Sequence, residues 1–173
     1  MSTLPVVRNE GSRSSHEIIQ LVSFELGHEE YGVDVLTVRE IIRMPVITKM
    51  PNTSEYVAGI INLRGTVVPI ISLRRRFGMC ESEQDRNSRI LVMEIGAGLT
   101  GFIVDGVSEV ISIDSSEIQA PPSMVLSGGV SREFISGVIN HAERLLILMD
   151  VGRMFSDDER ETFQPQLPMV ASP

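Results

Sequence analysis

The sequence predicts an all-β protein made of two small barrels that are related by an internal duplication. Short segments rich in Val and Ile follow one another, separated by Gly, Asn and Pro, which is typical of strands joined by close turns. Residues 57–77 (VAGIINLRGTVVPIISLRRRF) lie over residues 135–155 (ISGVINHAERLLILMDVGRMF) without a gap. Regular short strands in a repeated unit favour barrels, because closure removes exposed sheet edges.

The folded part begins near residue 17. Residues 1–16 are polar and aperiodic, so we expect a flexible N-terminal arm. In LVSFEL, residues 21–26, large apolar residues alternate with Ser and Glu, which predicts a strand with one buried face and one solvated face. Residues 156–173 start acidic and end in Pro-broken sequence, and we expect a flexible C-terminal tail there.

The repeat extends upstream of the matched stretch. Asp34 and REII (39–42) correspond, across a two-residue gap, to Asp105 and SEVI (108–111). The repeat units therefore span about 31–77 and 101–155, and each contains several strands and a closing turn. A unit of that size can close on itself as a five-stranded barrel.

Short helical segments are expected at three places. Val35–Ile42 could form two helical turns capped by Asp34, although its β-branched residues disfavour helix. LRRRF (73–77) and VGRMF (151–155) are predicted to be equivalent helical turns that close each copy. The segment 80–88 between the copies is predicted to be a polar connector.

Composition excludes several classes of function. A formal net charge of −8 and a pI near 4.9 argue against a nucleic-acid binder, which normally presents a basic face. Arg74, Arg75 and Arg76 form the one basic run, interpreted as a solvated helical turn. A single cysteine, Cys80, indicates a reducing compartment. With neither a secretory signal nor an apolar run of membrane-spanning length, we expect a soluble, cytoplasmic protein.

No pattern in the sequence predicts an active site. Residues 96–101 (GAGLTG) match a dinucleotide fingerprint, but an apolar strand follows where a helix would have to open, so a glycine-rich hairpin is the better interpretation. Asp34 and Asp105 lack the flanking residues of a protease dyad and are predicted to cap turns. The three histidines and Cys80 have no partners at ligand or nucleophile spacing, so we expect neither catalysis nor a metal or cofactor.

The two copies diverge at one turn. The first has Arg64-Gly65 where the second has Ala142-Glu143. Arg64 could pair with a carboxylate while Gly65 provides a positive φ in a hairpin. Arg64 could also contact a partner protein, because arginine is enriched at interface hot spots. Both roles are compatible.

Three segments resemble the CheW family of bacterial chemotaxis coupling proteins. They are EEYGVDVLTVREI (29–41), NLRGTVVPIISLRRRF (62–77) and VDGVSEVISI (104–113), and the resemblance covers about residues 18–155. The NLRG-x-x-x-P segment carries most of its specificity. Ser72 is a departure, because the family usually has Asp before the Leu-Arg.

The resemblance implies one CheW-like domain over residues 17–155, with two intertwined SH3-like five-stranded β-barrel subdomains and short helical turns. It implies a non-catalytic adaptor, without a cofactor, that links the cytoplasmic tip of chemoreceptors to the regulatory domain of the histidine kinase CheA. Such a protein is cytoplasmic and is recruited to receptor arrays at the inner membrane. By resemblance, the receptor-side candidates are Val38, Glu40, Ile41, Arg64, Val107 and Val110. Gly59 and Gly65 lie in segments associated with kinase contact.

Other interpretations stay open at this point. The chain could serve a different kinase array, such as one that controls pili, gliding or development. It could be a small hydrolase or binding protein on a duplicated β-barrel, or a fragment of a larger chemotaxis protein. If the barrels pack with two-fold symmetry, Val38 and Val107 could face a shared groove for a helical hairpin, or they could only seal the barrel ends.

Overall fold

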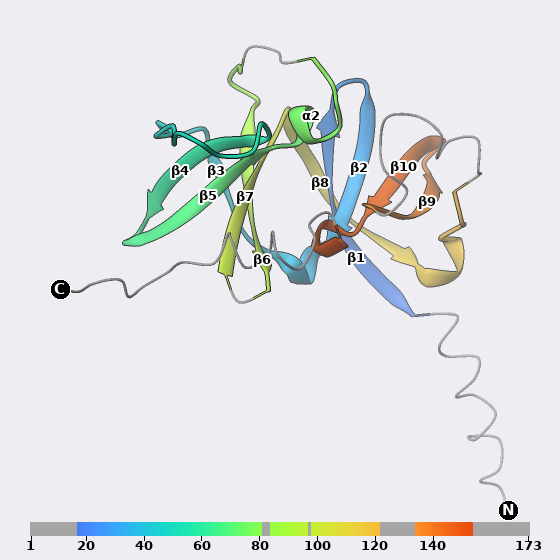
Figure 1. Cartoon of the computed structure of the whole chain (residues 1–173). Coiled ribbons are helices and arrows are strands. Elements are labelled where there is room, and N and C mark those ends of the chain that lie inside the picture. Colours follow the sequence, from blue (N-terminus) through green and yellow to red (C-terminus); the bar gives the residue numbers. More distant parts are fainter. Residues whose placement is uncertain (1–16, 81–83, 97, 122–133, 154–173) are drawn as a thin grey trace, which may run out of the picture.

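Ten strands form two five-stranded sheets in the computed structural model of the chain, which describes residues 17–80, 84–96, 98–121 and 134–153 (Figure 1). The strands are β1 (Ile18–Leu26), β2 (Glu29–Asp34), β3 (Val38–Arg43), β4 (Val57–Leu63), β5 (Thr66–Ser72), β6 (Arg89–Ile95), β7 (Gly98–Val104), β8 (Gly106–Asp114), β9 (Ile135–His141) and β10 (Arg144–Met149). The short helical elements are η1 (Val35–Thr37), α2 (Leu73–Arg76), η2 (Ser115–Glu117) and η5 (Val151–Arg153). The all-β prediction is confirmed.

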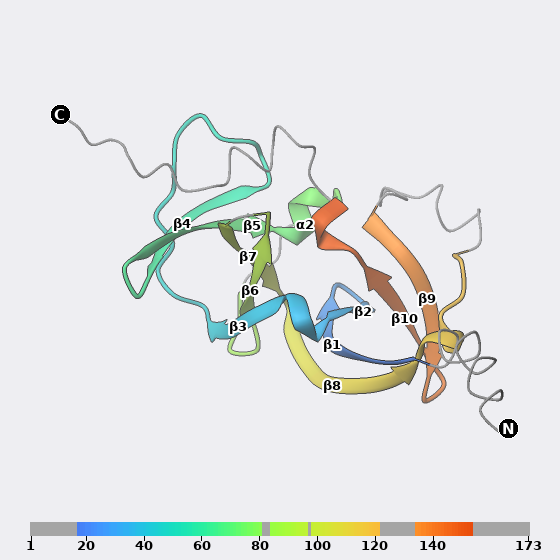
Figure 2. The same ribbon diagram turned by 90° about the horizontal axis from the view of Figure 1, so that it is seen from below.

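Each sheet takes strands from both copies of the repeat. One sheet has the order β8-β1-β2-β10-β9 and the other β3-β6-β7-β5-β4. In both, a central hairpin from one half of the chain, β1–β2 or β6–β7, is flanked by three strands from the other half. The expectation that the strands of one copy close on themselves is therefore wrong, and the two halves are intertwined (Figure 2).

The pairing directions follow the same plan in both sheets. β2 pairs in parallel with β10, and β5 pairs in parallel with β7, whereas all the other neighbouring strands are antiparallel. Parallel neighbours cannot be joined by a hairpin, so each parallel pair marks a place where a strand of one copy enters the sheet of the other.

The edges of each sheet are brought together beyond the end of β3 or β8. Thr48, which follows β3, bridges to Ile60 of β4 at the far edge of the same sheet, with N···O distances of 2.9 and 2.8 Å. Gln119, which follows β8 and η2, bridges in the same way to Val138 of β9. These bridges close both sheets into barrels and leave little free edge.

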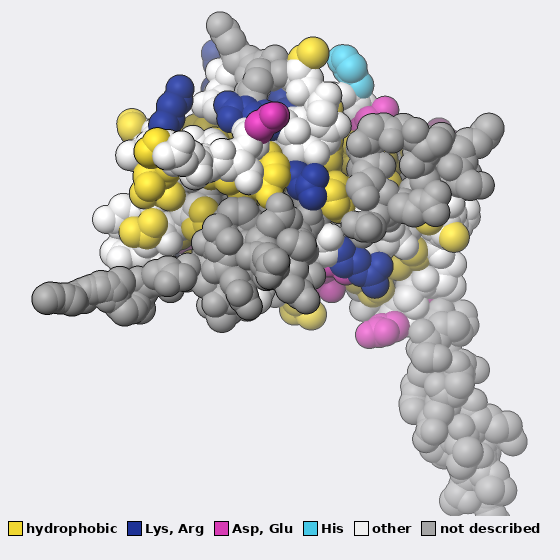
Figure 3. Space-filling view, in the orientation of Figure 1, with side chains coloured by type: hydrophobic (Ala, Val, Ile, Leu, Met, Phe, Trp, Pro, Cys, Tyr) yellow, Lys and Arg dark blue, Asp and Glu magenta, His cyan; other side chains and the backbone are white. Residues whose placement is uncertain are grey.

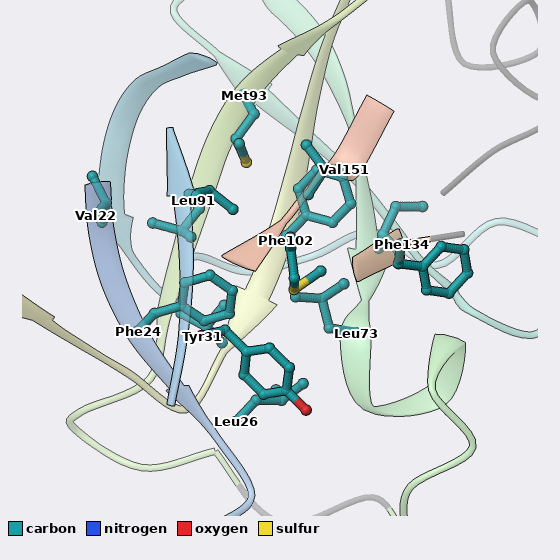
Figure 4. Close-up of a cluster of buried hydrophobic side chains, with 14 of the residues drawn as sticks. Val22, Phe24, Leu26, Tyr31, Leu73, Leu91, Met93, Phe102, Phe134 and Val151 are labelled. Atoms are coloured by element: carbon teal, nitrogen blue, oxygen red, sulfur yellow. The ribbon is translucent and has the colours of Figure 1, made fainter. Parts of the chain in front are cut away.

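Three apolar clusters hold the molecule together. Two of them each lie inside a single barrel: one surrounds Leu21 and the other surrounds Ile90. The third is the largest and lies between the sheets, with side chains from β1, β2, β6 and β7 (Figure 4). Phe24, Tyr31, Phe77 and Phe134 form a chain of ring contacts in it, with centroids 5.7 to 5.9 Å apart. The barrels therefore share a common core.

Two local predictions need correction. In β1 both faces are buried, because Leu21 lies inside a barrel while Phe24 packs in the shared core, and even Ser23 is only 1% exposed. Within Val35–Ile42 only η1 is helical, and β3 begins at Val38. The β-branched residues that weakened the helix prediction enter a strand instead. The helical turns that close each copy are confirmed as α2 and η5, apart from residues 154 and 155, which lie outside the described residues.

Candidate partner-binding surfaces

The strand registers define which residues of the two copies are equivalent. Leu26 pairs with Glu29 across one hairpin turn, and Ile95 pairs with Gly98 across the other. When the residues of the two halves are matched outward from these turns, β3 of the first half aligns with β8 of the second half without a gap. The receptor-side candidates then form equivalent pairs, Val38 with Val107 and Ile41 with Val110, and Glu40 is equivalent to Glu109.

The same count corrects the sequence alignment. Leu21 pairs with Asp34 in one hairpin, and its equivalent Ile90 pairs with Ile103 in the other. Asp34 is therefore equivalent to Ile103, and the match of Asp34 to Asp105 required a gap that the fold does not contain.

The equivalent pairs differ in exposure. Val38 and Val107 are half-buried and pack against the shared core. Ile41 is 40% exposed and Val110 is 55% exposed. β3 and β8 lie on the same side of the molecule, the lower side in Figure 2. Each barrel thus presents one exposed aliphatic side chain on the strand that borders the shared core.

Arg64 and Glu40 form an ion pair at the mouth of one barrel. Arg64 Nη1 and Nη2 each donate a hydrogen bond of 2.6 Å to one carboxylate oxygen of Glu40. The Arg64 side chain is 73% exposed and that of Glu40 is 26% exposed. These hydrogen bonds from Arg64 lower the pKa of Glu40, outweighing the opposing effect of burial, and the positive charge of Arg64 acts in the same direction. The pair joins β3 to the β4–β5 turn at the surface of the barrel.

The second copy makes a similar ionic contact from a different position. Arg144, at the start of β10, lies 3.6 Å from Glu109, the equivalent of Glu40, and 3.2 Å from Glu30 of β2. Glu30 also accepts a 3.2 Å hydrogen bond from the buried Ser23 hydroxyl. The exchange of Arg64 for Ala142 thus moves the arginine along the hairpin without removing the arginine–glutamate contact.

Both hairpin turns have the same backbone. Arg64 and Gly65 have φ values of 52° and 90°, and Ala142 and Glu143 have values of 53° and 64°. Two positive φ values in a two-residue loop define a type I′ turn, whose twist suits a hairpin. The prediction that Gly65 provides a positive φ is confirmed. The second copy adopts this geometry without glycine, so the turn alone does not explain the difference between the copies.

Gly59 of β4 is buried where the β3-β6-β7-β5-β4 sheet closes into the first barrel. A Cβ atom at this position would overlap the carbonyl oxygen of Thr48 and lie 2.7 Å from Ile47 Cγ2. At its equivalent Gly137, a Cβ atom would lie 2.5 Å from Ile118 Cγ2 and 3.0 Å from the carbonyl oxygen of Gln119, which forms the other bridge. Close packing therefore accounts for both glycines. Any contact that a partner makes at Gly59 would have to involve the neighbouring backbone and side chains.

Asp105 does not cap a turn, which corrects the sequence prediction. Its carboxylate accepts hydrogen bonds from Arg74 Nη2 at 2.7 Å, from Arg74 Nε at 3.1 Å and from the Gly27 amide at 2.8 Å. Burial opposes ionisation, but these hydrogen bonds and the Arg74 charge together lower the pKa of Asp105. Asp34 does cap η1, accepting from the Leu36 amide at 2.9 Å. Sequence reasoning missed the Arg74–Asp105 pair.

The arginine run is not a solvated turn, which is a second correction. Arg74 is held by Asp105, and Arg76 lies over two rings, 5.1 Å from the centroid of Tyr56 and 4.7 Å from that of Phe134. These two aromatic residues hold equivalent positions before β4 and β9, so Arg76 contacts both copies. Only Arg75 is exposed. Ser72, at the site of the usual Asp, caps α2 by accepting from the Arg75 amide at 3.3 Å.

Apolar side chains reach the surface beside β4 and β5 (Figure 3), where Val46, Met50 and Val67 are exposed. The predicted glycine-rich hairpin is confirmed, because β6 and β7 pair in an antiparallel way with Ile95 opposite Gly98. Across the described ranges, no three His, Cys, Asp or Glu side chains are grouped so that they could hold a metal ion. Nor does that part of the chain contain a helix of the length and apolarity that crossing a membrane requires.

Comparison with known proteins agrees with this architecture. A family model described as a CheW-like domain matches residues 20–159. The chemotaxis protein CheW of Klebsiella aerogenes is 36% identical over 140 residues, which cover 81% of this chain and 83% of that protein. CheW of Treponema pallidum is 33% identical over 147 residues, covering 83% and 85% of the two chains.

A solved structure shows the same fold. The crystal structure of the scaffolding protein TtCheW from Thermoanaerobacter tengcongensis matches with a TM-score of 0.74 and 36% identity, covering 81% of this chain and 89% of that one. Two intertwined five-stranded barrels with a shared core are thus the architecture of this chain, and the solved protein that matches it is described as a scaffolding protein. The chain belongs to the CheW family.

Proposed function

We propose that this protein is a non-catalytic adaptor that couples transmembrane chemoreceptors to the histidine kinase CheA in signalling arrays. The observation that carries the proposal is the pair Ile41 and Val110, exposed aliphatic side chains at equivalent positions of the two intertwined barrels. Membership of a scaffold family supports it. No cofactor is required for this role.

The receptor side comprises β3, β8 and the Arg64 side chain, which reaches over β3 from the β4–β5 turn. Exposed aliphatic side chains bordered by charges are typical of partner sites. The cytoplasmic tip of a receptor is a helical hairpin, and an amphipathic helix could place its apolar face on Ile41 and Val110. The ion pair of Arg64 and Glu40 lies beside Ile41 and would fix the orientation of a polar helix face. Val38 and Val107 support these positions from the shared core.

The kinase side is proposed at the closed end of the first barrel. Gly65 is exposed in the β4–β5 turn, and Gly59 lies in β4 where that barrel closes. The regulatory domain of CheA would contact this hairpin while a receptor occupies β3 and β8. Binding to both partners would recruit the protein to arrays at the inner membrane. The same surfaces would serve an array that controls pili, gliding or development.

The experiment separates the two sides. Ile41→Glu and Val110→Glu place a charge on the receptor side at exposed positions, so both variants should fold. Each should fail to co-sediment with receptor-containing membranes and should still bind CheA in a pull-down. Leu145→Glu is the matched control, because Leu145 is 58% exposed and belongs to neither proposed side. Loss of both partners in a folded Ile41→Glu variant, or normal co-sedimentation, would refute the receptor assignment.

A further inference from the structure

Three arginines line one surface hollow at an end of the second sheet. Arg43 ends β3, Arg89 begins β6, and Arg86 lies in the turn before β6. The hollow measures about 480 Å³, and Met44, Asp85, Asn87 and Ser88 complete its lining. This arrangement stands out in a chain whose formal net charge is −8.

Within the described part of the chain, no carboxylate forms an ion pair with any of these three arginines. Among the residues that the structure describes, Arg43 and Arg86 form no ion pair and their side chains donate no hydrogen bond. Arg89 Nη1 donates to the carbonyl oxygens of Arg86 and Ser88, at 2.7 and 2.8 Å, and not to a carboxylate. Asp85 is the single acid in the lining, and its side chain accepts from the Asn87 amide at 2.8 Å.

The positions of Arg43 and Arg89 are unfavourable for the stability of the sheet. They are direct cross-strand partners in the antiparallel pair of β3 and β6. Like charges directly opposite each other destabilise a sheet. Several other exposed arginines have carboxylate partners, such as Arg39 with Glu94 at 2.9 Å. A like-charge pair that forms no ion pair with an acid is typical of a site at which stability has been exchanged for binding.

The size and the surroundings of the hollow favour a short ligand. At physiological salt the Debye length is about 8 Å, so a ligand feels the three arginines only if it stays within the hollow. A nucleic acid or an anionic membrane would extend over the acidic remainder of the surface and be repelled there. Guanidinium groups bind carboxylates in paired hydrogen bonds, which suits a segment with two or three neighbouring Asp or Glu residues.

We infer that the Arg43–Arg86–Arg89 hollow is a binding site for a short acidic peptide segment of a partner protein. Arg43 and Ile41 are both exposed on β3, two residues apart, so the hollow adjoins the receptor side proposed above. A partner held by its apolar face on Ile41 could place acidic residues in the hollow at the same time. The inference does not depend on that assignment, because the test uses no receptor sequence.

Fluorescence anisotropy with a labelled hexaglutamate peptide tests the inference on the full-length chain. At roughly 50 mM salt, Arg43→Gln/Arg86→Gln should bind about tenfold more weakly than the parent, since each exposed ion pair contributes a few-fold in affinity. Lys49→Gln/Arg153→Gln removes the same charge elsewhere on the surface and should change binding by less than about twofold. A thermal melt of Arg43→Gln should show an unchanged or slightly higher midpoint, which a structural role would not give.

Three results would contradict the inference. If the control variant loses as much affinity as the cluster variant, the peptide responds only to net charge and the site is refuted. If a single-stranded DNA of equal charge binds the cluster more tightly than the peptide, the ligand class is wrong. A parent protein that does not bind hexaglutamate at low salt also overturns the inference.

Discussion

Arg64 shows how duplicated halves keep one interaction while changing its position. In the first half Arg64 reaches Glu40 from within the turn, and in the second half Arg144 reaches Glu109 from just beyond it. Both contacts join the edge strand of a barrel to its last hairpin. The exposed pair of Arg64 leaves its other donors available to a partner, whereas Arg144 also contacts Glu30, which is only 13% exposed.

Replacing these arginines should therefore have different consequences. Arg64→Ala removes an exposed ion pair, so the thermal midpoint should barely change. The pKa of Glu40 should rise toward its ordinary value, because the hydrogen bonds from Arg64 that lower it are lost. A carboxyl titration followed by NMR measures this rise. Arg144→Ala serves as the comparison and should lower the midpoint more, because it leaves the mostly buried Glu30 without its cation. A large loss of stability in Arg64→Ala would contradict the exposed geometry.

Asp105 makes stability depend on pH. Its pKa in the folded state lies below the unfolded value of about 3.9, because Arg74 and the Gly27 amide hold the ionised form. A lowered carboxyl pKa contributes stability above the unfolded pKa and loses it as pH falls through the folded pKa. Below about pH 4, part of the acid destabilisation should therefore come from this one group.

Asp105→Asn isolates that contribution. The variant should be less stable than the parent at neutral pH, by about 1–3 kcal/mol, since Arg74 loses its anion. The difference should shrink as the pH falls below about 4, because Asp105 is protonated first in the unfolded chain and then, at lower pH, in the folded parent. Denaturant unfolding at several pH values measures both effects. A difference that stays constant from pH 7 to pH 2 would show that ionisation of Asp105 contributes nothing.

The residue pairs were the hardest feature to predict from the sequence. The Arg64–carboxylate pair could be anticipated, but Glu40 could not be named as its partner, because strand closure alone brings them together. Asp105 was assigned to a cap because its true partners, Arg74 and Gly27, lie 31 and 78 residues away. One signal was present: the repeat places Gly152 opposite Arg74, which marks Arg74 as specific to the first copy.

At the scale of elements, two glycines permit barrel closure. Gly59 and Gly137 lie in the edge strands β4 and β9, directly beside the segments that bridge to them. Any side chain there would push the bridging segment away and reopen the sheet edge.

Alanine substitutions should rank these positions. Gly59→Ala should be the most damaging, since its Cβ would meet backbone atoms of Thr48 that cannot move aside, and its φ of 152° is also unfavourable. Gly137→Ala should cost less, because the closest atom belongs to the Ile118 side chain. Gly65→Ala is the control, with open space around it and only a positive φ, so we expect a loss of about 1 kcal/mol. Thermal melts provide the order. A Gly59→Ala protein as stable as Gly65→Ala would show that the closure tolerates a side chain.

Elements whose signal is local were predicted well. The closing turns α2 and η5, the hairpin of β6 and β7 and the positive φ at Gly65 all depend on neighbouring residues. The helix expected over Val35–Ile42 failed where a long-range effect decided the outcome. Those residues pair with β6, and this pairing outweighs a local cap at Asp34.

At the scale of the whole molecule, the exchange of hairpins could not be inferred from the residues of the repeat. The same apolar residues would be buried whether the strands of each copy closed a barrel by themselves or exchanged a hairpin with the other copy. The periodicity of the sequence therefore does not distinguish the two arrangements. Only the pairing of β2 with β10 and of β5 with β7 decides between the two arrangements. The exchange has a mechanical consequence: neither barrel can open without separating strands that belong to the other half of the chain.

The shared core and the exchanged strands predict a single unfolding transition. Leu21 and Ile90 are equivalent, fully buried residues, each in the private cluster of one barrel. Leu21→Ala and Ile90→Ala should each destabilise the protein by about 2–5 kcal/mol, the usual cost of a buried aliphatic truncation. Because the barrels are coupled, either change should shift the whole transition, and amide protection should fall in both sheets alike. Calorimetry and hydrogen exchange measure these quantities. If Leu21→Ala instead produced two separate transitions, with protection lost only in the β8-β1-β2-β10-β9 sheet, the barrels would be independent folding units despite their exchanged strands.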